Sequence, residues 1–395
     1  MATIQFRDPS PFLVRKQGGA PAPPPGDYVH TRYLEAMRLS PAPPKMEEIG
    51  VALCGCGRAG TIHMVNLVKN PRVRLLYVVE DAEERWPAIR AFWQLGDDTR
   101  LLRSKDLSTV LADARVQALV VATPTRSHEA IVTEALRARK AVFCEKPIAS
   151  DLEGTRRCYR LAREVGRPLL CAFNRRFDPS FSQVRREVRE GKVGHVHMIK
   201  TTSRDSPMPS LEYLETSGGI FCDCAVHDID MVLWVLGELP RRVATIARSN
   251  IPEIDGIGDW DTVAITLDFP SGSVGFIDLS RRSNYGYDQR LEVFGPRGMV
   301  SCGNEHPTPG VRITTPDRVA TSAPIWYSYP SRFAQGYARE LEHFLDAVQG
   351  KTKLSVTSRQ TEAVVKIAAA LTNAARTGQA VDLEWGPEEQ LLEEE

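Results

Sequence analysis

Two short motifs contain three ionisable side chains that could do acid–base chemistry. Lys146 stands within Glu145-Lys146-Pro147, and Asp223 lies four residues before His227 in a helix-like segment. An imidazole with an ordinary pKa of about 6.5 can accept a proton near neutral pH, and a carboxylate one turn away can orient its ring. A lysine can hydrogen-bond an oxygen on which negative charge develops, and we expect its pKa to be lowered. Such a set could carry out general acid–base chemistry.

The helix pattern by itself is compatible with more than one role for its polar residues. At about 100° per residue, Asp223, His227 and Asp230 fall within about 60° of one another, and the opposite arc is apolar. Polar groups that face a cleft on so apolar a helix must be paired or used. A satisfied core histidine beside an aspartate fits the same stripe. Metal binding by His227 is disfavoured, because no second histidine stands at ligand spacing.

A glycine-rich turn predicts a dinucleotide site. The segment Gly55-Cys56-Gly57-Arg58-Ala59-Gly60 has the spacing G-x-G-x-x-G and separates an apolar run at 49–53 from a helical pattern at 61–69. The first glycine permits the tight turn, the second lets a pyrophosphate approach the backbone, and the third lets helix and strand pack closely. The residues expected to contact the cofactor here are Gly55, Gly57, Arg58, Ala59 and Gly60.

An acidic residue after the next apolar run indicates which dinucleotide binds. Glu80 follows Gly60 by twenty residues, where a carboxylate can accept hydrogen bonds from the adenosine ribose. A carboxylate there repels the additional phosphate of NADP, so NAD is the expected cofactor. Asp81 stands directly beside Glu80 and leaves the exact residue open. A doubly wound domain that binds nothing is the alternative interpretation.

Alternating strands and helices must position these motifs. Apolar, strand-like runs separated by helical patterns occur at 49–53, 73–79, 118–122, 141–144 and 168–172. This rhythm predicts βαβ units and a parallel sheet. Ligands of open α/β sheets bind at the carboxyl ends of the strands, so we expect four more cofactor contacts there. They are Thr123, Pro124, His128 and Glu145.

The pattern changes beyond about residue 195. Strand-like runs now follow one another with short turns, at 263–269, 274–279, 290–294 and 299–302. They predict an antiparallel meander, and helical patterns follow it at 332–348 and 358–377. The fold class is therefore α/β, with a Rossmann doubly wound parallel sheet followed by a second domain that contains antiparallel strands.

Composition and the two ends of the chain limit which partners and which cellular compartment are expected. Residues 1–47 form a Pro/Ala-rich arm of expected extended backbone, for which a mitochondrial presequence is a disfavoured alternative because of the proline density. Residues 387–395 form an acidic, solvated tail. Lys plus Arg (50) equals Asp plus Glu (50), which predicts neither nucleic acid nor membrane as a partner. Eight scattered cysteines indicate reduced thiols and a cytoplasmic setting.

The glycine turn, Glu145-Lys146-Pro147, and Asp223 with His227 resemble the Gfo/Idh/MocA oxidoreductase family over residues 49 to about 385. Segments 203–207, 217–219 and 285–290 are most similar to its inositol 2-dehydrogenase subgroup. The resemblance implies an NAD-binding Rossmann domain at 48–172. It also implies a substrate-binding and oligomerisation domain at 173–386, with a large, mostly antiparallel open sheet that forms a homodimer or homotetramer.

The resemblance also implies site residues and a reaction. It carries the catalytic roles of the family onto Lys146, Asp223 and His227. A small polyol would be bound by Arg175, Asp205, Tyr285 and Tyr287. The implied reaction is NAD-dependent oxidation of a cyclic polyol, myo-inositol to 2-keto-myo-inositol. The alternatives are a related dehydrogenase acting on scyllo-inositol, an aldose or a dihydrodiol, and a non-catalytic regulator that senses the dinucleotide.

Overall fold

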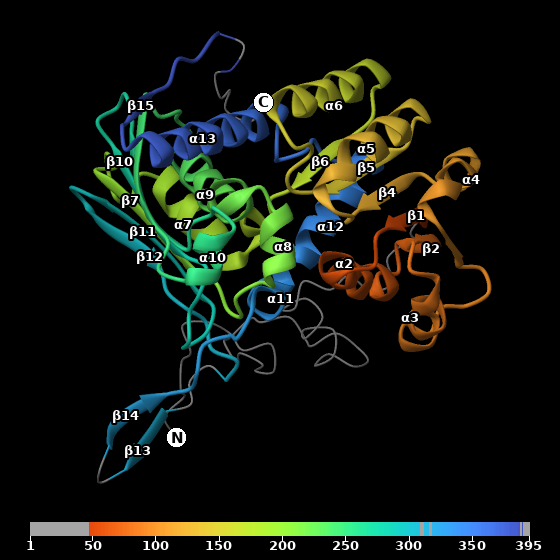
Figure 1. Ribbon diagram of the computed structural model, residues 1–395, viewed down its shortest axis with the longest axis horizontal. Helices are drawn as coiled ribbons and strands as arrows, with labels where there is room; N and C mark the ends of the chain where they lie inside the picture. Colours follow the sequence, from red (N-terminus) through yellow and green to blue (C-terminus); the bar gives the residue numbers. More distant parts are fainter. Residues whose placement is uncertain (1–46, 309–311, 316–317, 388, 390–395) are drawn as a thin grey trace, which may run out of the picture. The chain divides into compact units, whose positions relative to one another are not determined.

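A computed structural model describes residues 47–308, 312–315, 318–387 and 389 (Figure 1). Residues 1–46 of the expected arm and residues 388 and 390–395 of the acidic tail lie outside this part of the chain. Residues 49–395 form one unit that contains sheets of six, seven and two strands. All eight cysteines are free thiols. No helix in the described part of the chain is long and apolar enough to cross a membrane.

The six-stranded sheet is parallel throughout and has the order β3-β2-β1-β4-β5-β6. Every residue of β1, β4 and β6 is buried, which explains why these strands are continuous apolar runs. The strand order reverses between β1 and β4, where dinucleotides bind in doubly wound sheets. The predicted Rossmann fold is therefore confirmed. Its strands are β1 (Ile49–Cys54), β2 (Val73–Val79), β3 (Arg100–Leu102), β4 (Ala118–Val121), β5 (Ala141–Glu145) and β6 (Leu169–Ala172).

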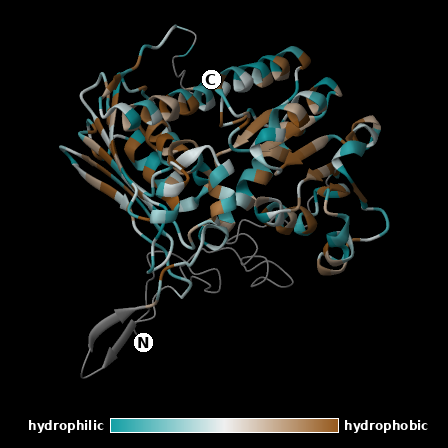
Figure 2. Cartoon of the chain, in the orientation of Figure 1, coloured by the Kyte–Doolittle hydropathy of each residue, from teal (hydrophilic) through white to brown (hydrophobic). Residues whose placement is uncertain are grey.

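Helices enclose this parallel sheet, and Figure 2 shows its hydrophobic strands between them. The turn Gly55–Gly60 leads from β1 directly into the first of these helices. Asp151 caps α6 by accepting a hydrogen bond from the Gly154 amide at 2.7 Å, and Gly166 ends it with φ at 63°. The helices of this region are α2 (Arg58–Lys69), α3 (Trp86–Phe92), α4 (Leu107–Ala112), α5 (His128–Arg137) and α6 (Leu152–Val165).

The seven-stranded sheet has the order β12-β11-β7-β10-β9-β8-β15 and is mostly antiparallel, as predicted. The predicted simple meander is wrong, because β7 lies between β10 and β11 and runs parallel to β10. Hydrophobicity did not reveal β7, since Thr201, Thr202 and Ser203 are polar although at most 3% exposed. The strands are β7 (Met198–Arg204), β8 (Arg242–Arg248), β9 (Thr262–Asp268), β10 (Val274–Ser280), β11 (Asp288–Gly295), β12 (Gly298–Cys302) and β15 (Val381–Asp382).

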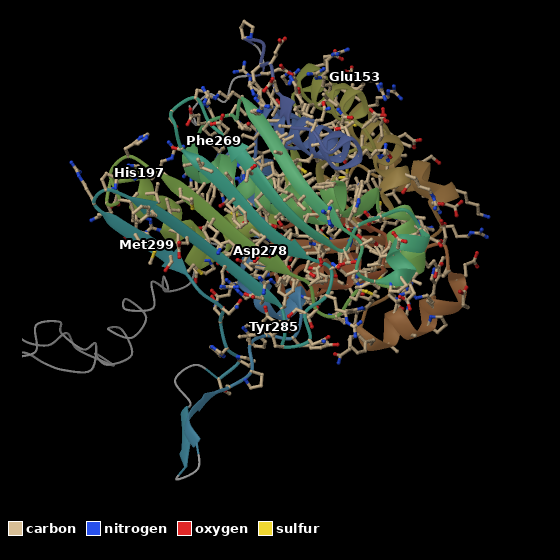
Figure 3. All side chains as sticks on the ribbon, turned by 60° about the vertical axis from the view of Figure 1, so that its left-hand side comes forward. Glu153, His197, Phe269, Asp278, Tyr285 and Met299 are labelled. Atoms are coloured by element: carbon tan, nitrogen blue, oxygen red, sulfur yellow. The ribbon has the colours of Figure 1, made fainter. Side chains whose placement is uncertain are left out.

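Helices α7 (Pro179–Arg189), α9 (Val226–Leu236) and α13 (Ser358–Thr377) cover one face of this sheet (Figure 1). The other face carries no helix among the described residues (Figure 3). Strands β13 (Arg312–Thr315) and β14 (Arg318–Ser322) form a separate hairpin. The remaining helices are α8 (Leu211–Thr216), α10 (Pro252–Gly256), α11 (Tyr329–Arg332) and α12 (Ala334–Val348).

Two buried ion pairs fix helix α9 to the turn that follows β6. Arg175 Nη1 lies 3.1 Å from Asp228 Oδ1, and Arg176 Nη2 lies 2.6 Å from Asp230 Oδ1. Asp230, which the helix pattern placed beside Asp223 and His227, is thus used for packing, and its side chain is 1% exposed. Removing one partner of such a pair typically costs about 3–5 kcal/mol. These contacts hold the helix that carries His227.

Gly60→Ala is expected to destabilise the fold, whereas Gly57→Ala is not. A Cβ at Gly60 would lie 2.0 Å from the Gly55 carbonyl oxygen, and a Cβ at Gly57 would meet nothing within 4 Å. We expect Gly60→Ala to lower the free energy of unfolding by about 3 kcal/mol and Gly57→Ala by less than about 1 kcal/mol. Urea denaturation followed by circular dichroism measures both. Equal stabilities of the two variants would contradict the proposed close packing.

Candidate active site

One cavity of about 500 Å³ joins the glycine turn to the three ionisable residues that the sequence singled out. Most of the predicted site residues line it: Gly57, Arg58, Ala59, Thr123, Pro124, His128, Glu145, Lys146, Arg175, Asp205, Asp223, His227 and Tyr287. Gly55, Gly60, Glu80 and Tyr285 are not part of its wall. Among the described residues no cluster of three or more histidine, cysteine or acidic side chains could hold a metal ion.

Lys146 and Asp223 form a direct ion pair across the cavity. Lys146, just after β5, donates through Nζ to Asp223 Oδ1 at 3.0 Å and to the Asp223 carbonyl oxygen at 2.7 Å. Burial is the largest single influence and by itself would lower the pKa of Lys146, but the neighbouring groups, with the Asp223 carboxylate first among them, together outweigh it and raise the pKa. The expected lowering of the lysine pKa is therefore wrong. Lys146 is an ammonium group and acts as a hydrogen-bond donor.

Asp223 holds two further donors, neither of which was predicted from the sequence. Tyr213 donates its hydroxyl to Oδ1 at 2.7 Å, and Arg281 donates to Oδ2 at 2.7 Å. Burial opposes the charge on the carboxyl, but Lys146 and then Arg281 outweigh it and hold the pKa of Asp223 far below its usual range. The carboxylate is therefore ionised over the whole working range of pH.

Arg281 is fully buried and follows the end of β10. It also donates to Asp259 Oδ2 at 3.0 Å. Its position continues the inward-facing alternation of Ile277 and Leu279, which are at most 1% exposed. An arginine in phase with buried residues was the signal that could have revealed it.

His227 supplies a base to the same cavity. It lies in the first turn of α9, and Phe173 packs edge-on against its ring with centroids 6.3 Å apart. Burial, followed by the charges of Lys146 and Arg175, lowers the pKa of His227 well below 6.5. The neutral ring, which can accept a proton, is therefore the form present near pH 7. Asp223 was expected to orient this ring, but its carboxylate is bonded to Lys146 and the other donors instead.

The predicted polyol contacts separate into two groups. Arg175 pairs with Asp228 and donates to Ser203 Oγ at 3.1 Å, while Asp205 and Tyr287 face the cavity beside it. Burial, and then the nearby Asp223, raises the pKa of Asp205.

Tyr285 lies away from the cavity and is 56% exposed (Figure 3). Its hydroxyl donates to Asp288 at 2.6 Å and accepts from Arg204 at 3.0 Å. Gly286, with φ at 124°, turns the backbone between Tyr285 and the buried Tyr287. The predicted substrate contact of Tyr285 is therefore not found within this chain.

Two residues predicted to touch the cofactor make hydrogen bonds within the chain that brace the strand ends. The ring nitrogens of His128 lie 2.7 Å from the Pro147 carbonyl oxygen and 2.8 Å from that of Thr123. His128 therefore joins the ends of β4 and β5, and a hydrogen bond from it to a ligand is not supported. Glu145 lies 2.7 Å from Nε2 of His63 on α2, which ties the motif after β5 to the glycine turn's own helix.

The glycine turn fits a dinucleotide. Open space beside Gly57 lies at the amino end of α2, where unpaired amides favour a pyrophosphate. Glu80 accepts from the Cys56 amide at 3.1 Å and the Ala82 amide at 3.1 Å, so its carboxylate lies against the turn. Asp81 instead accepts from the amide and hydroxyl of Ser104. The structure thus places Glu80, rather than Asp81, next to the cofactor region.

Comparisons with known proteins agree with this geometry. The family model described as "Oxidoreductase family, NAD-binding Rossmann fold" matches residues 49–173, and the one described as "Oxidoreductase family, C-terminal alpha/beta domain" matches residues 185–383. The chain belongs to the Gfo/Idh/MocA oxidoreductase family. It is an NAD-dependent oxidoreductase.

Several relatives in this family are named for inositols. Inositol 2-dehydrogenase of Rhizobium meliloti is 37% identical over 298 residues, which cover 75% of this chain and 88% of that protein. Myo-inositol 2-dehydrogenase of Thermotoga maritima is 35% identical over 301 residues, with coverages of 76% and 88%. The crystal structure of a myo-inositol dehydrogenase from Corynebacterium glutamicum has a TM-score of 0.79 and 30% identity, and covers 86% of this chain and 100% of that one.

The pH dependence of kcat/KM for alcohol oxidation tests the state of His227. Because burial, Lys146 and Arg175 lower its pKa well below 6.5, the imidazole accepts protons at and above that pH. The acidic limb of kcat/KM is therefore expected below pH 6.5. Initial rates from about pH 5 to 8 measure it, and NADH binding over the same range is the control. A limb centred at or above pH 6.5 would contradict the neutral base.

Proposed function

We propose that this chain oxidises the cyclic polyol myo-inositol to 2-keto-myo-inositol with NAD. The proposal is carried by the Lys146–Asp223 ion pair, with Nζ and Oδ1 3.0 Å apart, in one cavity with the neutral His227 and the glycine turn. The inositol dehydrogenases among the relatives support the choice of substrate.

The residues of the cavity would divide the work of oxidation. His227 accepts the hydroxyl proton on an imidazole nitrogen. Lys146, kept cationic by Asp223, donates a hydrogen bond to the oxygen as negative charge develops on it. Gly57, Arg58, Ala59 and Glu80 hold the dinucleotide. NAD, when bound, accepts the hydride from the carbinol carbon.

The lining of the cavity suits a neutral polyol better than a sugar phosphate. Asp205 offers carboxylate acceptors, and Tyr287 and Ser203 offer hydroxyl groups that can donate or accept. The positive charge of Arg175 is already balanced by Asp228 at 3.1 Å. A ring with several hydroxyl groups can bond to such a mixture, whereas a phosphate dianion placed at these residues would meet the carboxylate of Asp205.

A panel of substrates tests the function directly. The purified full chain is mixed with NAD or NADP and with myo-inositol, scyllo-inositol, glucose or a dihydrodiol, and absorbance of the reduced nicotinamide is followed. We expect the highest kcat/KM with myo-inositol and NAD. A higher value for another alcohol would replace the proposed substrate. NADH binding without turnover of any alcohol would favour the regulator.

Lys146→Ala is expected to lower kcat about a hundredfold or more, because it removes the donor to the developing oxyanion. NADH affinity, measured by fluorescence titration, should change little, since Asp223 keeps its bonds to Tyr213 and Arg281. Lys366→Ala is the matched control. Lys366 lies on α13, outside the cavity, and the substitution removes an ammonium that is bonded to Glu389. Unchanged turnover in Lys146→Ala would refute its assigned role.

We also propose that the uncovered face of the seven-stranded sheet joins copies of this chain. Directly paired residues of four neighbouring strands form an apolar row on it, because paired residues point to the same face. The row consists of Val274, Met198, Phe294 and Met299, which are 37%, 44%, 48% and 56% exposed. Continuous exposed apolar surface of this kind is typical of an interface.

Phe294→Glu combined with Met299→Glu is expected to dissociate the oligomer, because two charges would be buried without partners. Light scattering after gel filtration should give at least two chain masses for the wild type and one for the variant. Phe92→Glu, on α3 and 76% exposed, adds a charge away from the sheet as a control. A wild-type chain that is monomeric at micromolar concentration would exclude this interface.

A further inference from the structure

Two aromatic rings from the second domain pack against an arginine of the glycine turn. The guanidinium carbon of Arg58 lies 4.4 Å from the ring centroid of Tyr213, on α8, and 5.7 Å from that of Tyr329, on α11. All three residues line the cavity. Such contacts use the flat face of the guanidinium and leave the N–H groups at its edge for an anion. Among the described residues, no hydrogen bond or ion pair involves these N–H groups.

The other end of Tyr213 reaches the catalytic ion pair. Its hydroxyl donates to Asp223 Oδ1 at 2.7 Å, and the same oxygen accepts from Lys146 Nζ at 3.0 Å. Burial raises the pKa of Tyr213, so the phenol keeps its proton and remains a donor. One side chain therefore touches both the arginine of the cofactor turn and the carboxylate that holds the catalytic lysine.

The local sequence explains how Tyr213 comes to this place. Ser210 caps α8, and Gly218 and Gly219, both with φ at 86°, reverse the chain after it. Within α8 only Leu214 is buried, at 2% exposure, so Leu214 and Tyr213 hold the helix against the rest of the domain. A short helix with so little apolar anchoring depends on the two polar contacts of Tyr213.

We propose that Tyr213 is a positioning residue that couples cofactor binding at Arg58 to the placement of Lys146. The proposal rests on the function given above. A dinucleotide phosphate bonded to the edge of the Arg58 guanidinium would fix the ring stacked on its face, and the phenol would then hold Asp223 Oδ1. Without the Tyr213 hydroxyl, Asp223 Oδ1 would accept a hydrogen bond from Lys146 alone. The carboxylate would then draw the Lys146 ammonium away from the substrate oxygen.

Two substitutions distinguish the contribution of the Tyr213 ring from that of its hydroxyl. Tyr213→Phe keeps the stacking surface and removes the bond to Asp223, so NADH affinity should stay within about twofold while kcat falls about tenfold. Tyr213→Leu also removes the ring, so the dissociation constant of NADH should rise about threefold or more in addition. NADH affinity is measured by fluorescence titration of the chain without polyol, and kcat with saturating myo-inositol and NAD.

A matched control and a double variant complete the test. Tyr159→Phe removes another buried phenol bond, 2.9 Å to Thr361, outside the cavity, and should alter neither quantity. Arg58→Met should weaken NADH binding, and in Arg58→Met/Tyr213→Leu the combined loss should be smaller than the product of the single losses. Thermal unfolding of every variant shows whether it is folded.

The outcomes are decisive in both directions. Three results would each overturn the coupling. They are equal NADH affinities for Tyr213→Phe and Tyr213→Leu, a loss of NADH affinity in the double variant equal to the product of the single losses, and an unchanged kcat in Tyr213→Phe. If the wild type oxidises no polyol, the proposed substrate fails, and the catalytic half of the coupling fails with it. The two NADH comparisons still decide whether the ring supports Arg58, because they need no turnover.

Discussion

The carboxylate of Asp223 lies buried between the cations of Lys146 and Arg281, and the surrounding structure has to compensate for the removal of three charges from water. Each desolvated ion costs several kcal/mol, and only short contacts and additional hydrogen bonds recover this free energy. Here the compensation comes from Tyr213 and Asp259. The arrangement keeps Lys146 protonated, so in the proposed reaction it can donate a hydrogen bond to the substrate oxygen but cannot be the base, a role left to His227.

The same principle recurs in the layers around the cavity. Consecutive arginines after β6 meet alternate aspartates on α9, so Arg175 and Arg176 are neutralised by Asp228 and Asp230. These pairs fix α9 against the junction of the two sheets. His128 and Glu145 use hydrogen bonds in the same way to hold the strand ends. Some polar residues that the sequence suggests as ligand contacts thus fix the positions of the residues that face the cavity.

The sequence predicted the parallel sheet well, because fully buried strands appear as apolar runs, and β3 was missed because it has only three residues. It also brought Lys146, Asp223 and His227 together through motif positions. It could not show that Lys146 and Asp223 touch, so the direction of the lysine pKa shift was mistaken. Tyr213 was missed because a six-residue helix has too little periodicity to place its side chains. The sequence could not show that Tyr285 lies outside the cavity of this chain, because Gly286, with φ at 124°, turns the backbone between it and Tyr287.

The backbone between α8 and α9 carries one more consequence. Phe221–Ala225 forms a π-helical turn, which accommodates one residue more than an α-helical turn. Removing or adding a residue between Asp223 and His227 would rotate one side chain by about 100° relative to the other. This stretch should therefore accept changes of side chain more readily than changes of length, so the number of residues between the carboxylate and the imidazole matters as much as their identity.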